Sequence, residues 1–187
     1  MPPAGANGEN DDALMARVVA RDSAAFRLLI DRHGERIYRI AWRMTGNRTE
    51  AEDVAQDALL KLWTLTGWQA GQGGVGAWLA RVATNSCLDR LRKRRFVSDD
   101  EMPERTDEAP LADARIAADV EADVARDAIA ALPDAQRAAI VLTYYEDLPN
   151  KEAAEALGLN IKAFESLLFR ARTALKQALR GLREEAA

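Results

Sequence analysis

Apolar residues recur every three or four positions along most of the chain, and runs in which apolar and polar residues alternate are scarce. That spacing gathers the apolar side chains on one face of an α-helix. Ala, Leu, Arg and Glu, which favour helices, dominate the composition. We therefore predict an all-α protein. The expected helices cover residues 11–19, 23–45, 48–65, 75–95, 120–131, 134–145, 151–157 and 161–182.

Two stretches interrupt this pattern and divide the chain. Residues 67–76 contain five glycines, which predict a flexible loop. After residue 95 the chain becomes acidic and contains Pro103 and Pro110, as is typical of a linker between domains. The fold class that follows is two small helical domains joined by a flexible acidic linker. The parts are a disordered tail at 1–11, a domain at 12–95, the linker at 96–122 and a second domain at 123–183.

The net charge of −4 argues against nucleic-acid binding, but the charges are unevenly distributed. Residues 78–95 and residues 161–183 each hold six basic residues against a single acid. Residues 99–127 hold eleven acids against three arginines. Two basic segments separated by an acidic one indicate two anion-binding surfaces on separate domains. For either segment alone, the alternative is an ordinary solvated helix face.

The composition also bears on the class of protein. With 187 residues, 48% of them hydrophobic, the chain can form a sizeable core. No apolar run reaches the roughly 18 residues of a membrane span, and the N-terminus lacks the apolar segment of a signal peptide, so we expect a cytoplasmic protein. Cys87 and His33 are the only cysteine and histidine, so we expect no metal site, no cofactor and no enzyme active site. We expect Cys87 to be buried, and His33 to lie at the surface or at a helix end.

Residues 150–161 have the pattern of a helix-turn-helix. Asn150 can cap a short first helix, whose apolar face consists of small residues and Leu157. Gly158 can supply the left-handed turn at which such a helix ends. The following helix has apolar residues at core-facing spacing, namely Phe164, Leu167, Leu168, Ala171 and Leu175. In this motif the second helix enters the major groove of DNA.

The opposite face of that second helix supplies candidates for reading DNA. These residues are Lys162, Glu165, Ser166, Phe169, Arg170 and Thr173. Arg170 and Lys162 can bridge phosphates or base edges, whereas Ser166 and Glu165 can hydrogen-bond bases. Phe169 can touch a thymine methyl group or pack against a neighbouring helix. An ordinary helical hairpin is the alternative, but the coincidence of the glycine turn and the basic face favours DNA binding.

The predicted helix over 48–65 has an acidic face. Thr49 is a candidate N-cap, and the acids that follow suit the positive end of the helix dipole. A second face, distinct from the core stripe, contains Asp53, Gln56, Asp57 and Leu60. Acids and an amide around one apolar residue suit a protein-binding surface. From spacing alone, a solvated face with an incidental leucine is the commoner explanation.

The helix that follows the glycine loop combines aromatic, amide and basic residues. Its candidate face comprises Trp78, Arg81, Asn85, Asp89, Arg92 and Lys93. An asparagine can read a base edge while arginine and lysine hold phosphates. The loop before the helix can admit an unstacked base. Trp68 and Trp78 are nevertheless more often core residues than stacking platforms.

Taken together, these segments resemble the extracytoplasmic-function (ECF) sigma factors, over nearly the whole chain from Asp12 to Arg183. Residues 51–63 carry the most specific match, to the polymerase-binding helix of that family. The other matching segments, in the family's order, are 22–33 with Ile37 and Tyr38, then 77–95, then 131–133 and 165–175. The glycine-rich loop departs from the family pattern, in which an aromatic or bulky residue is common.

The resemblance implies roles that the spacing does not. The face containing Asp53 and Leu60 would bind the clamp helices of the largest subunit of core RNA polymerase. The loop at 67–76, with Asn85 nearby, would capture a flipped base of the promoter −10 element. The helix from Ile161 would read the −35 element. Members are usually held inactive by an anti-sigma protein, and stress response is their usual context.

Three rival interpretations remain. A sigma-like mimic could titrate an anti-sigma factor without binding DNA, but it would not need the two basic segments. A one-component repressor could use the helix-turn-helix alone, but it would not need the acidic polymerase-binding motif. An enzyme is the weakest interpretation because residues 71–76 lack the Gly-Lys-Ser/Thr ending of a phosphate-binding loop.

Overall fold

The computed structural model describes residues 9–69, 74–97 and 125–185. All regular elements within these ranges are helices, which confirms the all-α prediction. We call residues 9–97 the N-terminal domain and residues 125–185 the C-terminal domain. The predicted disordered tail lies mostly outside the described residues, and the predicted acidic linker almost entirely so.

The N-terminal domain begins with two capped helices. Helix α1 (Asp11–Val19) starts after Asn10, whose side chain accepts a hydrogen bond from the Ala13 N–H. Helix α2 (Ser23–Thr45) starts after Asp22, which caps it, and ends at Gly46 in the left-handed conformation. A short polar side chain at the N-cap satisfies N–H groups that lack partners within the helix. The predicted breaks between residues 21 and 22 and at Gly46 are therefore confirmed.

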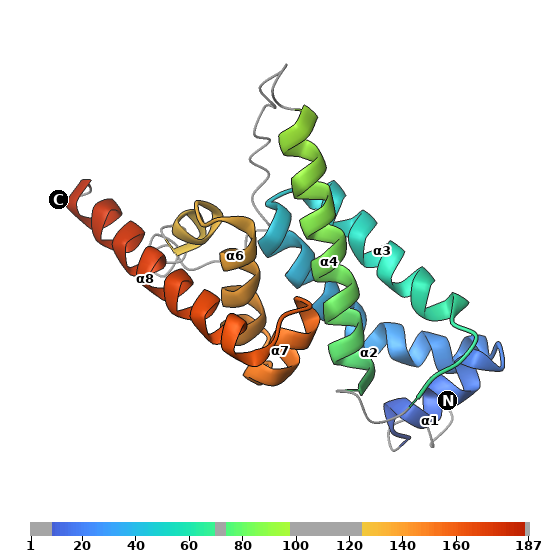
Figure 1. Cartoon of the computed structure of the whole chain (residues 1–187). Helices are drawn as coiled ribbons and strands as arrows, with labels where there is room; N and C mark the ends of the chain where they lie inside the picture. The colour runs from blue at the N-terminus through green and yellow to red at the C-terminus, as the bar shows by residue number, and fades with distance from the viewer. Residues whose placement is uncertain (1–8, 70–73, 98–124, 186–187) are drawn as a thin grey trace.

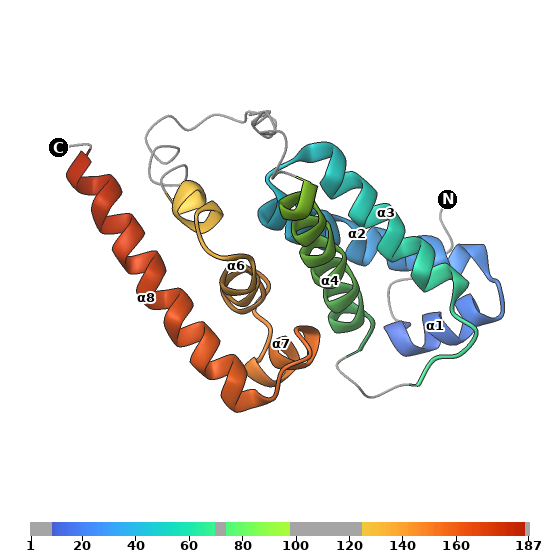
Figure 2. The same cartoon turned by 45° about the horizontal axis from the view of Figure 1, so that its top comes forward.

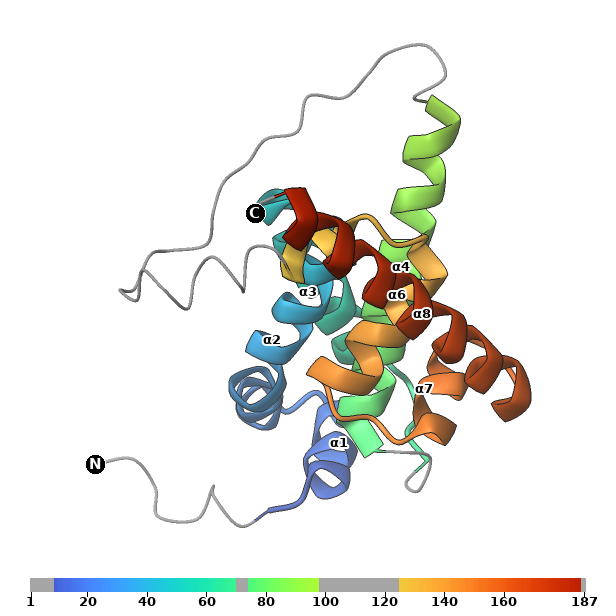
Figure 3. The same ribbon diagram turned by 90° about the vertical axis from the view of Figure 1, so that its left-hand side faces the viewer.

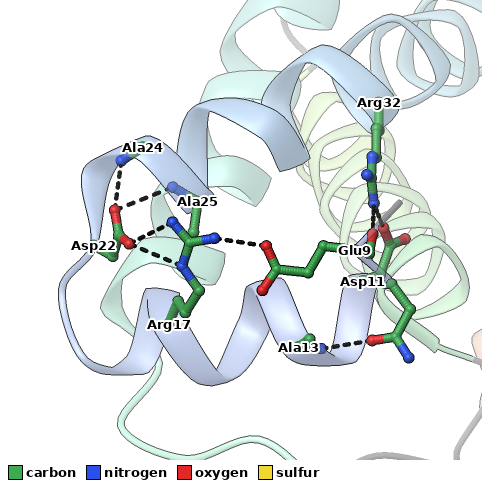
Figure 4. A network of polar contacts seen from close by, with 9 residues as sticks. Glu9, Asp11, Ala13, Arg17, Asp22, Ala24, Ala25 and Arg32 are labelled. Atoms are coloured by element: carbon green, nitrogen blue, oxygen red, sulfur yellow. Dashed lines mark hydrogen bonds and ion pairs between the residues drawn. The ribbon is translucent and has the colours of Figure 1, made fainter. Parts of the chain in front are cut away.

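A polar network ties α1 to α2. Figure 4 shows Arg17 between Glu9 and Asp22, and Arg32 of α2 reaching back to Asp11. Hydrogen bonds from the Arg17 guanidinium and the Ala25 N–H hold the pKa of the Asp22 carboxyl below its usual value. The Asp22 carboxylate therefore keeps its charge to lower pH than an isolated aspartate, and it pairs with Arg17 at 2.7 Å across the turn between α1 and α2.

Helix α3 (Arg48–Thr64) follows after a single turn. The expectation that Thr49 caps it is wrong, because the Asn47 side chain accepts the Glu50 N–H at 3.0 Å and the helix begins at Arg48. Asparagine is at least as good a cap as threonine, and here it lies two residues earlier. Of the predicted core stripe, Ala51, Val54, Ala55, Ala58 and Leu62 are buried, and Leu59 is half-buried against the core.

Helix α4 (Gly74–Val97) completes the N-terminal domain. Gly74 and Gly76, which we assigned to the flexible loop, lie inside it, and residues 70–73 of that loop are outside the described residues. Gly76 suits a close contact, since a Cβ added there would lie 3.2 Å from Arg36 Nη1 and 3.3 Å from His33 Cε1. The helix also runs two residues beyond the predicted end at Arg95.

The C-terminal domain is built around the helix-turn-helix. A helix over 125–130 precedes α6 (Asp134–Ile140), which begins after Pro133 as expected. We predicted one helix over 134–145, but the chain changes at Val141 into a π-helical turn, η1 (Val141–Tyr145). Helix α7 (Asn150–Ala156) and helix α8 (Ile161–Glu185) follow.

The turn between α7 and α8 is partly as predicted. Gly158 adopts a left-handed φ of 66°, which confirms its role at the exit of α7. The expectation that Asn150 caps α7 is wrong, because the helix already begins at Asn150 and no side chain caps it. A cap that we did not predict is Asn160, whose side chain accepts the Ala163 N–H at 2.9 Å in the first turn of α8.

The two domains pack against each other through α4, α2 and the α6–α7 segment. Figures 1 and 2 show α6 and α7 lying between α4 on one side and the long α8 on the other. Figure 3, seen from the side of α8, shows α8 in front of α6. The buried apolar side chains of both domains form one continuous cluster. Helix α3 lies on the side of α4 away from α7 (Figures 1 and 2).

Three single residues complete the comparison with the sequence. Cys87 is fully buried, as expected, and burial raises the pKa of its thiol to about 12. His33 is not a surface or helix-end residue: it lies within α2, its side chain is 13% exposed, and its Nε2 lies 2.6 Å from Asp11 Oδ2. Trp68 packs edge-to-face on Trp78 with ring centroids 6.4 Å apart, and its Nε1 donates to Asp12.

Candidate functional site

The four candidate residues of α3 form one exposed face. Asp53, Gln56, Asp57 and Leu60 are all exposed, because they lie at i, i+3, i+4 and i+7 on the side opposite the buried stripe. Leu60, the apolar member of this face, is 58% exposed. An apolar side chain surrounded by acids suits docking to a protein surface with basic and apolar groups.

Arg90 of α4 is part of this face, although its sequence position did not suggest it. Its guanidinium lies 3.0 Å from Asp57 Oδ2 and 3.5 Å from Asp53 Oδ2. All three side chains are partly exposed, so the pairing positions the two carboxylates more than it stabilises the fold. Sequence periodicity within α4 places Arg90 on its surface but cannot show that the acids of α3 face it.

The candidate residues of α4 also share one face. Arg81, Asn85, Asp89, Arg92 and Lys93 are exposed, whereas Trp78 is half-buried against Trp68 and the core. Arg92 pairs with Asp89 at 2.8 Å along the helix. The face is therefore a strip of mainly basic residues with one amide. Trp78 packs against the core near the N-terminus of α4, as is commoner for a tryptophan than base stacking.

A cavity of about 220 Å³ opens at that N-terminal end of α4. The N-terminal domain contributes Trp68, Trp78 and Arg81 to its wall, among others. The wall on the other side comes from α7, with Glu152 and Glu155. Aromatic faces next to an arginine can hold a planar unstacked base, but two carboxylates lie at the same cavity.

The candidate face of α8 is fully open. Every predicted member is exposed: Lys162, Glu165, Ser166, Phe169, Arg170 and Thr173. Behind it, Phe164, Leu167, Leu168 and Ala171 are buried as expected, and Leu175 is half-buried. Phe169 is 71% exposed, so the alternative that it packs against a neighbouring helix is wrong. The hydroxyl of Thr173 donates back to the Phe169 carbonyl at 3.0 Å.

Three further features of the described residues concern metal ligands, the cysteine and helix hydropathy. Within the described ranges, no three His, Cys, Asp or Glu side chains are grouped so that they could hold a metal ion. The thiol of Cys87 is buried with a raised pKa, which makes it a poor nucleophile. Among the helices of the described ranges, none has the length and apolar content that crossing a membrane requires.

The residues that join the two domains were not predicted from the sequence. Arg36 and Arg43 of α2 both reach Glu146, and Arg137 of α6 donates to the Met44 carbonyl. Their partners lie about a hundred residues away in the sequence, so neither periodicity nor local motifs could have paired them. The seven-residue spacing of Arg36 and Arg43 indicates only that they share a helix face.

Family models match both domains of the chain. The model of sigma-70 region 2 matches residues 29–97, and the model of sigma-70 region 4 matches residues 123–175. The first match covers most of α2, α3 and α4, and the second covers the helix-turn-helix. Together they include all three candidate faces.

Relatives and solved structures agree with the family models. The chain is 32% identical to the ECF RNA polymerase sigma factor SigE of Mycolicibacterium smegmatis over 81% of its own length, and spans 60% of that protein. It is 34% identical to SigM of Mycobacterium tuberculosis, with 94% of this chain and 87% of the relative covered.

Two solved structures resemble the whole fold. CnrH, in complex with the cytosolic domain of CnrY, matches with a TM-score of 0.69 and 27% identity over 91% of this chain and 97% of that one. The sigma factor RpoE, in complex with the anti-sigma factor NepR from Bartonella quintana, matches with a TM-score of 0.68 and 25% identity over 83% and 96%. The chain belongs to the ECF sigma factors, a family of transcription initiation factors and not of enzymes.

Proposed function

We propose that this chain directs bacterial RNA polymerase to promoters through three separate surfaces, one for the polymerase and two for DNA. One observation carries the proposal. On each of α3, α4 and α8 the candidate residues lie on a single helix face, and all of them except Trp78 are exposed. Core packing explains none of these exposed side chains. Residues 12–95 and 123–183 act as the two functional units.

The α3 face binds the clamp helices of the polymerase's largest subunit. Leu60 enters an apolar recess, while Asp53, Gln56 and Asp57 pair with polar and basic groups around it. Arg90 presents the two carboxylates in a fixed orientation. Association with polymerase then places α4 and α8 along the DNA.

The α4 face acts on the −10 element. Arg81, Arg92 and Lys93 hold phosphates, and Asn85 contacts a base edge. The cavity beside Trp78 and Arg81 receives the flipped base. Capture of an unstacked base favours the melted duplex over the paired one, which opens the promoter at this point.

The α8 face reads the −35 element from the major groove. Arg170 and Lys162 contact phosphates or base edges, and Glu165 and Ser166 hydrogen-bond bases. Phe169, exposed and apolar, contacts a thymine methyl group. Because these contacts are made to an intact duplex, α8 fixes the position of the complex while α4 acts on the melted strand.

An anti-sigma protein controls this activity in the cytoplasm, where polymerase and DNA are found. Support comes from the similar RpoE chain, which was solved in complex with the anti-sigma factor NepR. The partner is a protein that covers surfaces of both domains, and stress response is the expected context of its release.

Run-off transcription with purified core polymerase tests the proposal. The wild-type chain is expected to initiate at specific promoters, and the double variant Asp53→Ala with Leu60→Ala is expected to lose about tenfold or more in polymerase association while keeping its helical content. Glu35→Ala, at an exposed acid on α2, is the matched control and should act like the wild type. A chain that binds an anti-sigma protein but never initiates would instead be the sigma-like mimic.

A further inference from the structure

The cavity lined by Trp68, Trp78 and Arg81 at the N-terminal end of α4, which we call the −10 cavity, has one wall residue that is fixed from two sides. The Trp68 ring packs edge-to-face on Trp78, with the ring centroids 6.4 Å apart. Its Nε1 donates a hydrogen bond to Oδ1 of Asp12, in the first turn of α1, at 2.8 Å. The Asp12 carboxylate therefore contacts the wall of the cavity from behind, without lining the cavity itself.

The segment that carries Trp68 has no regular secondary structure. Helix α3 ends at Thr64, and residues 65–69 form neither helix nor strand. Without a repeating pattern of backbone hydrogen bonds, side-chain contacts decide where such a segment lies. Tryptophan combines an apolar ring with a single N–H donor, and a buried or half-buried indole usually finds an acceptor for that donor. Asp12 is the acceptor for Trp68.

Helix α1 is itself anchored to α2 next to Asp12. Asp11 Oδ1 lies 2.7 Å from Arg32 Nη1, as Figure 4 shows, and Asp11 Oδ2 lies 2.6 Å from His33 Nε2. Burial raises the pKa of the Asp11 carboxyl, but the hydrogen bonds from Arg32 and His33 outweigh burial and hold the pKa below its usual value. Two adjacent carboxylates thus tie the start of α1 to α2 and to Trp68.

The other end of α1 contacts the end of α3. Arg21, which follows α1, donates from Nη1 to the Trp63 carbonyl, and its guanidinium lies 5.6 Å from the centre of the Trp63 ring. Trp63 also packs on Phe26 of α2, with ring centroids 5.0 Å apart. Helix α1 and the residue pair after it therefore hold both ends of residues 63–68, the segment that leads from α3 to the −10 cavity. The buried residues of α1 between these contacts are Leu14, Met15 and Val18.

A fixed indole matters for the capture of a base. An unstacked base binds by stacking on aromatic rings, so the ring must be held in one orientation. If Trp68 turned away, Trp78 would lose its edge contact and the cavity would lose one aromatic wall. A side chain that is ordered only on binding lowers the affinity by the entropy of ordering it. A wall that is fixed beforehand avoids that loss.

We propose that Asp12 is a positioning residue for the −10 element, which acts by holding Trp68 in place as an aromatic wall of the −10 cavity. Asp12 does not touch DNA in this role, and its effect passes through the Trp68 N–H. The inference rests on the proposed function and deepens it, because it takes the −10 cavity as the site that receives a promoter base. It adds α1 to α4 as an element on which base capture depends.

A double-mutant cycle in the holoenzyme tests this role. Core polymerase carrying Asp12→Ala, Trp68→Phe or both binds a fluorescent single-stranded oligonucleotide with the −10 sequence of a promoter at which the wild type initiates. Asp12→Ala is expected to weaken binding about tenfold, as for the loss of one hydrogen bond to a charged group. Trp68→Phe keeps an aromatic ring but removes the N–H, so it should weaken binding to a similar degree. The double variant should bind no more weakly than either single variant.

Two further variants separate positioning from folding. Asp12→Asn retains an acceptor for the Trp68 N–H, so it should bind the oligonucleotide within about threefold of the wild type. Asn10→Ala removes the cap that accepts the Ala13 N–H at the start of α1, but it leaves Asp12 and Trp68 unchanged. It should lower the urea midpoint of the chain while the affinity for the oligonucleotide stays at the wild-type value.

Each remaining outcome would overturn a specific claim. Wild-type affinity in a folded Asp12→Ala variant, or losses that add up in the double variant, would show that Asp12 does not act through Trp68. A loss in Asn10→Ala as large as that in Asp12→Ala would reduce Asp12 to a structural role. If Asp12→Ala fails to fold, Trp68→Phe decides, because wild-type affinity there would exclude the N–H. If the proposed function itself fails, the wild-type holoenzyme neither binds the oligonucleotide nor initiates.

Discussion

The α4 and α8 faces carry similar charge patterns but lie in different surroundings. Each is a strip of basic and polar residues along one side of a long helix, with a buried apolar side behind it. The α8 face is open along its whole length, whereas the α4 face begins at a cavity that α7 shares. Similar helices thus differ in accessibility because of what packs against them, not because of their own sequence.

For the two proposed DNA-binding faces, this difference shows that the helices packed nearby, and not charge alone, set how accessible each face is. The proposed recognition of duplex DNA by α8 requires only an exposed face, and the packing of the two domains leaves that face open. The proposed capture of an unstacked base by α4 also requires room in the cavity, one wall of which is supplied by α7. Three comparisons of variants test this difference by changing α8 or its cap and leaving α4 intact.

The largest effect is expected from Phe164 of α8, with Phe169 on the opposite side of the helix as its control. Phe164→Ala should destabilise the C-terminal domain by about 3–5 kcal/mol, because Phe164 is fully buried and its removal leaves a cavity. Phe169→Ala should change stability by less than about 0.5 kcal/mol, because Phe169 is 71% exposed. Urea denaturation followed by circular dichroism measures both, and equal losses would contradict the assignment of the two sides of α8.

A smaller effect is expected on DNA recognition from Arg170. Arg170→Ala should weaken binding to the −35 duplex by about 1–3 kcal/mol if its guanidinium reads a base edge. Binding of a single-stranded −10 oligonucleotide should stay at the wild-type value, because Arg170 lies on α8 and not near the cavity. Arg172→Ala, an exposed neighbour outside the candidate face, provides the matched loss of charge. Equal losses in the two variants would remove Arg170 from base recognition.

The smallest effect is expected from the cap of α8. Asn160→Ala should cost about 1 kcal/mol of stability, because the Ala163 N–H loses its acceptor. Asn150→Ala serves as the control and should lower stability by less, since α7 has no side-chain cap and Asn150 lies inside the helix. Thermal unfolding of the two variants measures the difference, and a larger loss for Asn150→Ala would restore the sequence-based cap assignment.

Helix positions and exposed faces were predictable because both follow from local periodicity. The buried stripe of α3 and the six exposed residues of α8 lie as the spacing of apolar residues predicts. Caps were less predictable, because Asn47 and Thr49 are both suitable and only the three-dimensional structure selects between them. The end of the α6 helix was missed because a π-helical turn has no clear sequence signal.

The junction between the domains could not be predicted at all. Arg36 and Glu146 are separated by 110 residues, and each alone looks like an ordinary charged residue near a helix surface. Their pairing depends on how α6 and α7 pack against α2 and α4. Similarly, Arg90 becomes part of the α3 face only when the helices are assembled.

The most direct test of the account is transcription by core polymerase carrying this chain on a library of templates. The −10 and −35 positions are randomised independently, and the initiating templates are sequenced. The account predicts that particular sequences are enriched at both positions, at a constant separation, because α4 and α8 act together on one promoter. Enrichment at one position only, or no initiation on any template, would contradict it.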